Sequence, residues 1–192
     1  MPVQIGATTH NFSDPTGLLS DCHRRIEMFL GTLIAVAEVI DRPPTEDTAR
    51  AMESALRYFG QAAPKHTADE EESLFPRLRQ IQDAEIQAAF SRLEGLEAEH
   101  LWAAPLHAEV ERLGARYLST RSLSSREVGV FRTAVQDLAV MYKQHIAVED
   151  EFVFPLAARV LSDAAKSAIA AEMAGRRKVR VVTDLAAGWS KV

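Results

Sequence analysis

Residues 144–157 read QHIAVEDEFVFPLA, and residues 65–78 read KHTADEEESLFPRL. In each stretch a histidine is followed four positions later by a glutamate, then by two more acidic residues and a Phe-Pro pair. Corresponding residues lie 79 positions apart, and self-similarity at a fixed spacing indicates a repeated structural unit. A further histidine precedes each stretch, at positions 23 and 100, with a leucine four residues before it. The chain therefore reads as two copies of a helical hairpin.

The periodicity around these stretches predicts helices. Apolar residues recur at spacings of three and four, which is typical of helices that bury one face. The pattern predicts long helices over residues 15–40, 45–79, 84–118 and 125–161, and a shorter one from about 163 to 175. Asp14 before Pro15, and Ser124 or Ser125 before Glu127, are typical of helix starts.

Prolines and short links set the expected arrangement of these helices. Pro64 and Pro76 should kink the second helix and Pro105 should interrupt the third, because proline removes a helix hydrogen bond. Short links between long helices favour antiparallel neighbours. We therefore expect an all-α fold, an up-down antiparallel four-helix bundle with a short additional C-terminal helix. The expected parts are an N-terminal extension (1–14), the bundle (15–161), and a C-terminal helix and tail (162–192).

Composition excludes several classes of protein. The chain has 192 residues, 47% of them hydrophobic, which suits one packed core. Its net charge of -5 argues against a nucleic-acid-binding surface. The single cysteine, Cys22, cannot form an internal disulfide, so a cytoplasmic location is expected. The longest apolar stretch, residues 29–36, falls short of the ~20 residues that a membrane span needs, so no membrane association is expected.

Acidic and imidazole side chains fall on the predicted apolar faces. His-x-x-x-acid spacing alone is weak evidence, because most of the six histidines in this chain have it. The pairs His66–Glu70 and His145–Glu149 differ because both members lie on the apolar face and share a flanking sequence. An ionised carboxylate buried without a partner costs several kcal/mol, so something must compensate it. Imidazole and carboxylate donors on adjacent turns suit iron, manganese or zinc, although hydrogen bonds within the core are the alternative.

The whole pattern resembles the hemerythrin-like, or HHE cation-binding, family over about residues 15–161. It consists of a lone histidine on the first helix, His-x-x-x-Glu-Glu-x-x-Leu-Phe-Pro on the second, Glu-His on the third and a second His-x-x-x-Glu with Phe-Pro on the fourth. The later run LSDAAKSAIAAEMAGRR, residues 161–177, resembles the segment that follows the bundle in such proteins.

The resemblance implies two non-heme iron ions inside the bundle, which bind dioxygen, nitric oxide or a related small ligand such as peroxide. It implies that His23 and His66 hold one ion and that His100 and His145 hold the other. Glu70 and Glu149 would bridge them. The protein would act as a sensor, a scavenger or a redox protein, either as a monomer or as a homodimer.

One position departs from the oxygen-carrying hemerythrins, which have a second histidine one turn from the third-helix ligand. Here that position is Leu96 or Ala104, so one iron would lack a protein ligand. Tyr142, one turn before His145, could fill part of the gap or could be a core residue. Asp150 competes with Glu149 as the fourth-helix ligand, and the repeat favours Glu149.

Other residues and other functions stay open at this point. Glu27, one turn from His23, could be an additional carboxylate ligand, a supporting residue or a surface residue. His107 lies two turns from His100, too far to share one ion with it, and could support the site from the core. A ferritin-like iron oxidase or store needs Glu-x-x-His on two helices, and Glu97 to His100 supplies one copy. A metal-free helical adaptor is a further alternative. Since we find no nucleophile beside a base and no phosphate-binding loop, any enzymatic chemistry would be redox chemistry of the metal.

Overall fold

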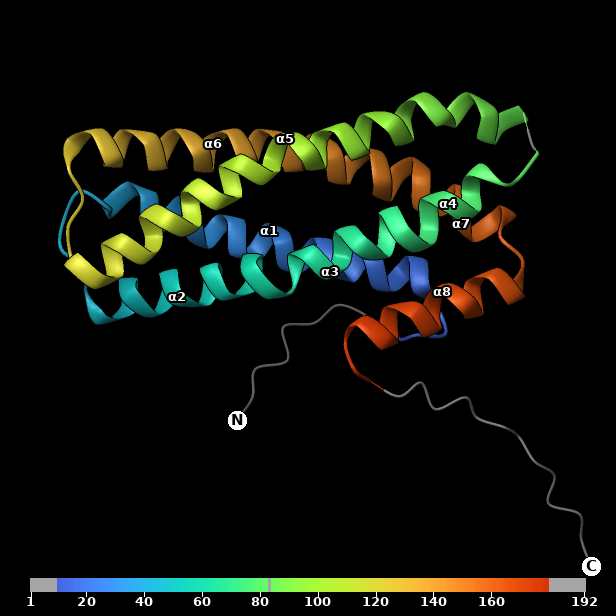
Figure 1. Ribbon diagram of the computed structural model, residues 1–192, viewed down its shortest axis with the longest axis horizontal. Helices are drawn as coiled ribbons and strands as arrows, with labels where there is room; N and C mark the ends of the chain where they lie inside the picture. The colour runs from blue at the N-terminus through green and yellow to red at the C-terminus, as the bar shows by residue number, and fades with distance from the viewer. Residues whose placement is uncertain (1–9, 83, 180–192) are drawn as a thin grey trace, which may run out of the picture.

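The computed structural model describes residues 10–82 and 84–179. Its elements follow the chain as α1 (Pro15–Val39), α2 (Glu46–Gln61), α3 (Ala63–Ala68), the π-helix η1 (Asp69–Leu74), α4 (Phe75–Arg79), α5 (Ala84–Thr120), α6 (Ser125–Val148), the π-helix η2 (Glu149–Val153), α7 (Phe154–Val160) and α8 (Asp163–Arg176). They form four antiparallel helical segments, which we call legs (Figure 1). The first leg is α1, the second is α2 to α4, the third is α5, and the fourth is α6 to α7. The predicted up-down four-helix bundle with an extra C-terminal helix is confirmed.

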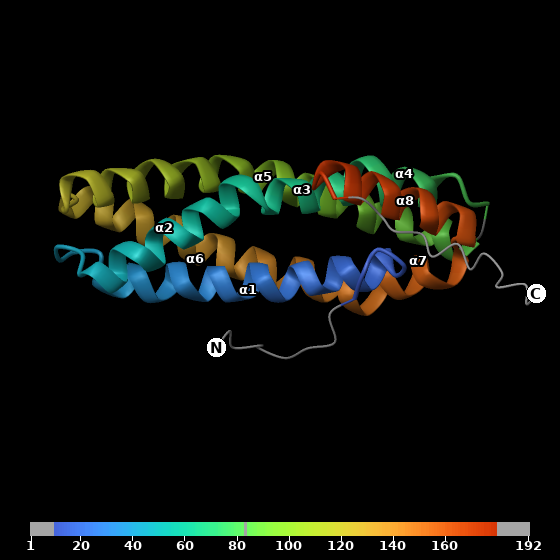
Figure 2. The same ribbon diagram turned by 90° about the horizontal axis from the view of Figure 1, so that it is seen from below.

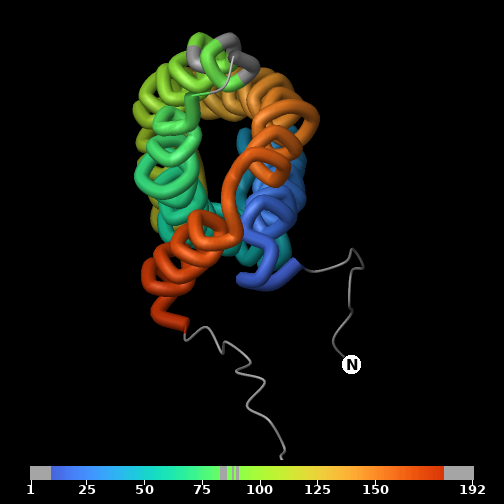
Figure 3. Tube along the Cα trace, turned by 90° about the vertical axis from the view of Figure 1, so that its right-hand side faces the viewer, coloured from blue at the N-terminus to red at the C-terminus, as the bar shows by residue number. Residues whose placement is uncertain are grey.

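The four legs surround a common axis (Figure 3). α1 packs against α2 and α6, and α5 packs against the same two helices from the other side. α8 lies outside the bundle, against α1 and η1, as the view from below also shows (Figure 2). Among the described residues no helix is long and apolar enough to cross a membrane. The predicted C-terminal tail lies largely outside the described residues, and the proposed boundary at residue 161 stays a prediction.

Side-chain caps begin the helices where the sequence indicates. The Asp14 carboxylate accepts a hydrogen bond from the Gly17 backbone N–H, and Pro15 occupies the first turn of α1. Ser124 and Glu127 form a reciprocal capping box at the start of α6. Ser162 caps α8 through the backbone N–H of residue 165. Each cap satisfies a backbone donor that the helix itself leaves unpaired.

The three prolines act differently from one another. Pro64 and Pro76 lie in the first turns of α3 and α4, so each marks a break in the second leg. The expected interruption at Pro105 is wrong, because α5 continues through it. Proline removes the hydrogen bond to the carbonyl of Leu101, but Leu101 is 78% exposed and Pro105 is also exposed. Water can therefore satisfy the carbonyl, and the helix persists.

The core is divided into two apolar clusters. The cluster near the α1–α2 link includes Ile26, Leu33, Met52, Leu113, Phe131 and Leu138. The cluster near the α4–α5 link includes Leu19, Leu74, Phe75, Leu93, Val153 and Ile169. Along α1, His23 lies between Leu19 of one cluster and Ile26 of the other, and the predicted site residues of the other legs lie at the same level. A polar layer thus separates the two apolar clusters.

Candidate metal centre

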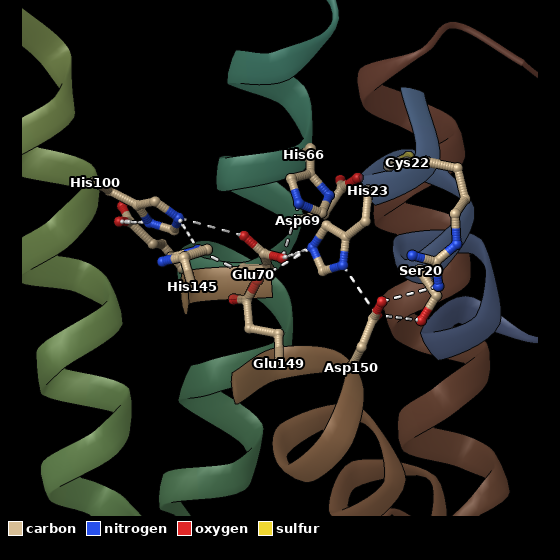
Figure 4. A network of polar contacts seen from close by, with 12 residues as sticks. Ser20, Cys22, His23, His66, Asp69, Glu70, His100, His145, Glu149 and Asp150 are labelled. Atoms are coloured by element: carbon tan, nitrogen blue, oxygen red, sulfur yellow. Dashed lines mark hydrogen bonds and ion pairs between the residues drawn. The ribbon is translucent and has the colours of Figure 1, made fainter. Parts of the chain in front are cut away.

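The polar layer contains all six predicted metal ligands. His23 comes from α1, His66 and Glu70 from the second leg, His100 from α5, and His145 and Glu149 from the fourth leg. Both glutamates are completely buried, and the His100 side chain is 10% exposed. In Figure 4 the two glutamates lie between His23 and His66 on one side and His100 and His145 on the other. The structure therefore brings together residues that are far apart in the sequence.

The donor atoms form two groups. In what we call the first half-site, His23 Nε2 lies 3.1 Å from Glu149 Oε2, and His66 Nε2 lies 3.1 Å from Glu70 Oε1. In the second half-site, His145 Nε2 lies 3.2 Å from Glu149 Oε2 and 3.0 Å from His100 Nε2. His100 Nε2 also lies 3.7 Å from Glu70 Oε2. Within each group one donor atom per residue lies within 4.8 Å of the others, and both groups contain Glu70 and Glu149.

Wider helical turns hold the two glutamates in place. The Phe75 backbone N–H donates to the carbonyl of Glu70, and the Phe154 N–H donates to the carbonyl of Glu149, each five residues back. A proline follows each phenylalanine, and its ring would crowd the carbonyl of the residue four positions back in a regular α-helix. The wider turn relieves this crowding. The repeated Phe-Pro pair was the signal for these π-helical turns, which are frequent at functional sites.

Three of the imidazoles are hydrogen-bonded at Nδ1 to carboxylates outside the two groups. His23 Nδ1 lies 2.9 Å from Asp150 Oδ1. His100 Nδ1 lies 2.8 Å from Glu71, and His145 Nδ1 lies 2.8 Å from Glu99. A carboxylate at Nδ1 fixes the proton on that nitrogen, which leaves Nε2 free to bind a metal. All three Nε2 atoms point toward the glutamates.

The acids that directly follow Glu70 and Glu149 each contact a histidine of the other hairpin. Glu71 belongs to the first hairpin but contacts His100 of the second, while Asp150 of the second contacts His23 of the first. The Asp150 carboxylate also accepts hydrogen bonds from Ser20 and Arg24, so it faces α1 and not the shared glutamates. Sequence spacing alone could not show whether Asp150 binds a metal or supports His23.

Unpaired buried atoms show that the layer fits a cation. Both carboxylate oxygens of Glu70 and Glu149, His23 Nε2 and His66 Nδ1 are buried without a hydrogen bond of good geometry among the described residues. Burial and the adjacent Glu149 raise the pKa of Glu70 well above its ordinary value. Burial lowers the pKa of His66 well below its ordinary value. Positive charge between the glutamates would compensate them, and the mixed imidazole and carboxylate set suits iron, manganese or zinc.

The remaining candidates lie outside both half-sites. The Tyr142 hydroxyl and His107 Nε2 are hydrogen-bonded over 2.8 Å, and burial lowers the pKa of His107 to about 4, so this imidazole is neutral near pH 7. Glu27 is about half exposed and pairs with Arg24. Position 96 is a buried leucine and Ala104 is exposed.

Two alternative interpretations gain no support from the geometry. The Glu97 carboxylate contacts Arg79 through both of its oxygens, at 2.8 and 2.6 Å, and is absent from both half-sites. The one Glu-x-x-His copy is therefore not arranged as a ferritin-like centre needs. A metal-free adaptor would require the buried polar atoms to satisfy one another, but the imidazole–glutamate contacts of 3.1 to 3.2 Å leave the glutamate oxygens without a hydrogen bond of good geometry among the described residues.

One buried acid was missed by sequence reasoning. Asp69, next to Glu70, is completely buried and forms ion pairs with Arg176 at 2.9 Å and Arg177 at 2.6 Å. Both arginines lie at the end of α8. The acidic run at 69–72 and the basic pair at 176–177 were the available signals, but each is also typical of a solvated surface. The contact fixes α8 against the turn that carries Glu70.

Comparisons with known proteins agree with this geometry. A protein of Haemophilus influenzae whose function is uncharacterised is 25% identical over 170 residues, which cover 88% of this chain and 93% of that protein. Residues 14–173 match the hemerythrin HHE cation-binding domain, so the match includes all four legs and most of α8. The chain therefore belongs to the hemerythrin HHE cation-binding family.

Proposed function

We propose that this protein holds two non-heme iron ions and binds dioxygen, nitric oxide or peroxide at them. His23 and His66 would bind one ion, and His100 and His145 the other. Glu70 and Glu149 would bridge the pair. The observation that carries this proposal is that two groups of donor atoms share both glutamates, each of which offers two oxygens that lack hydrogen bonds.

The donor set favours iron over a closed structural zinc site. Each half-site offers four protein residues, two imidazoles and two carboxylates. Structural zinc is complete with four ligands, whereas six-coordinate iron keeps positions for an external ligand. When bound, iron supplies the one-electron chemistry that protein side chains lack. A role as sensor, scavenger or redox protein is consistent with such a centre.

The surrounding residues prepare the site in two ways. Asp150, Glu71 and Glu99 hold the Nδ1 protons of three imidazoles and so orient their rings. The two apolar clusters on either side exclude water from the layer. Electrostatic interactions strengthen where water is excluded, so the buried glutamates favour a strongly charged cation.

Metal analysis of protein purified in air tests the proposal. We expect about two irons per chain with charge-transfer absorption in the visible range. Glu70→Ala and Glu149→Ala should each remove most of the iron, because each takes a donor from both half-sites. Glu27→Ala, which changes an exposed acid paired with Arg24, is the matched control and should keep its iron.

Circular dichroism distinguishes loss of metal from loss of fold in these variants. Zinc alone, or a metal-free wild type with native helicity, would overturn the proposal. Equal iron loss in Glu27→Ala and Glu149→Ala would show that the centre lies elsewhere.

A further inference from the structure

A cavity of about 430 Å³ lies beside the second half-site, between α2 and α3 on one side and α5 on the other. His100 lines it, and its other polar lining residues are Thr67 of α3, His107 and Glu111 of α5, and Tyr142 of α6. The rest of the wall is largely apolar and includes Leu56, Phe59, Ala63, Ala103 and Val110. Of the described residues that line it, none is a lysine or an arginine.

Small side chains create this space. Ala104 and Ala108 of α5 face Gly60 of α2 across it, and all three positions are exposed at its rim. Ala104 lies one turn after His100. A larger side chain at this position would occupy volume that this chain leaves open.

The cavity is larger than a diatomic ligand needs. A molecule the size of water takes about 30 Å³, whereas this cavity is more than ten times as large. Its volume lies within the range of pockets for small organic ligands, about 300–1,000 Å³. Because its walls are mostly apolar, a bound molecule gains free energy by transferring apolar surface out of water.

The polar residues that line the cavity determine which polar group a ligand can carry. Tyr142 and His107 Nε2 share one hydrogen bond, and in either tautomer of His107 the hydroxyl oxygen still has a lone pair that can accept another. A hydroxyl group on the ligand would be the donor. A carboxylate is disfavoured, since no lining cation balances its charge and Glu111 lies on the wall.

We propose that this cavity binds a small neutral organic molecule with an apolar body and one hydroxyl group, such as a phenol, next to His100. The binding site itself depends only on the cavity, and its role as a site for a second substrate or effector of the metal centre rests on the proposed function. The first hairpin has no counterpart, because the positions equivalent to Tyr142 and His107 are Ala63 and Leu30.

Fluorine NMR on the full-length, metal-free chain tests the proposal with two probes, 4-fluorophenol and fluorobenzene. We expect 4-fluorophenol to bind about five- to tenfold more tightly, which is what one hydrogen bond contributes. Tyr142→Phe should remove the difference between the probes. An absence of 4-fluorophenol binding up to its solubility limit, or equal affinity of both probes for the wild type, would overturn the proposal.

Glycine substitutions show where the probe binds. A Cβ added at Gly60 meets no atom within 4 Å, so Gly60→Leu should fold and fill the cavity. The matched control is Gly129→Leu, another exposed helical glycine with open space, which does not line the cavity. We expect Gly60→Leu to weaken 4-fluorophenol binding at least tenfold and Gly129→Leu to leave it unchanged. Equal affinities in the two variants would place the probe elsewhere and contradict the proposal.

Iron content distinguishes this proposal from the proposed function. Probe binding to a chain that never acquires iron would support the cavity site and remove its role beside a metal. Two irons per chain without probe binding would support the metal centre and overturn the cavity site.

Discussion

The two half-sites have equivalent donors but different surroundings. In the second, Glu99 holds Nδ1 of His145. In the first, the equivalent imidazole nitrogen of His66 has no hydrogen-bond partner in the described part of the chain, and the position that corresponds to Glu99 is the buried Cys22. The candidate donors thus recur in both hairpins, whereas the residues behind them differ. The two half-sites are therefore not equivalent.

The two half-sites also differ in how far they are covered. The first half-site is covered by α8, which is fixed by the ion pairs between Asp69 and two arginines. The second lies beside the cavity, where the His100 side chain keeps 10% exposure. We infer that an external ligand reaches the second half-site first.

Among the changes that separate the two half-sites, loss of one imidazole, made in a separate variant for each half-site, has the largest expected effect. His66→Ala takes a nitrogen from the first group and His145→Ala takes one from the second. Each variant should lose about one of two irons, because the partner group keeps its own imidazoles. Metal analysis of both purified variants provides the measurement. If either substitution left two irons in place, the division into half-sites would be wrong.

Acid should destabilise the native chain in part through His107, which lines the cavity beside the second half-site. Burial lowers the pKa of His107 from 6.5 to about 4, so the unfolded chain takes up this proton at a higher pH than the native one. Native stability is therefore lost as pH falls from 6.5 toward 4, by about 3 kcal/mol from this group. His107→Gln keeps a hydrogen-bond acceptor but does not titrate.

Urea unfolding of the metal-free chain across this pH range measures the difference between wild type and His107→Gln. The free energy of unfolding of the wild type should fall relative to that of the variant as the pH drops. Parallel pH profiles would mean that His107 is not buried as the structure has it.

Replacing a carboxylate that contacts Nδ1 of an imidazole should have a smaller effect on iron binding. Glu99→Gln weakens the support of His145, so iron in the second half-site should bind about tenfold less tightly. Glu97→Gln, two residues away and paired with Arg79, is the matched control. Competition with a chelator gives the two affinities. An equal change in both variants would indicate a general charge effect and not a contact with His145.

Much of the fold was predictable, because helical periodicity, caps and the repeat all indicate the same bundle. The continuous path of α5 through Pro105 was not, since it depends on whether one carbonyl faces water. Glu70 and Glu149 were predicted as site residues because a buried acid is costly wherever it lies on an apolar face, and the repeat added the four histidines. That all six lie together in space needed the structure.

Supporting contacts were harder to predict than the donors. Asp150 contacts His23 over 127 positions, and Asp69 contacts Arg176 over 107. Periodicity places such residues on a helix face but does not say which residue of another leg they meet. The cavity was also hidden in the sequence, because small residues such as Ala104 leave space only when the facing wall is known.

Anomalous diffraction at the iron edge, on crystals of the protein purified in air, would locate the metal directly. We expect two iron peaks in the polar layer, each bound by two imidazoles, with Glu70 and Glu149 in contact with both. A single peak, or iron bound without these glutamates, would contradict the proposed two-iron centre.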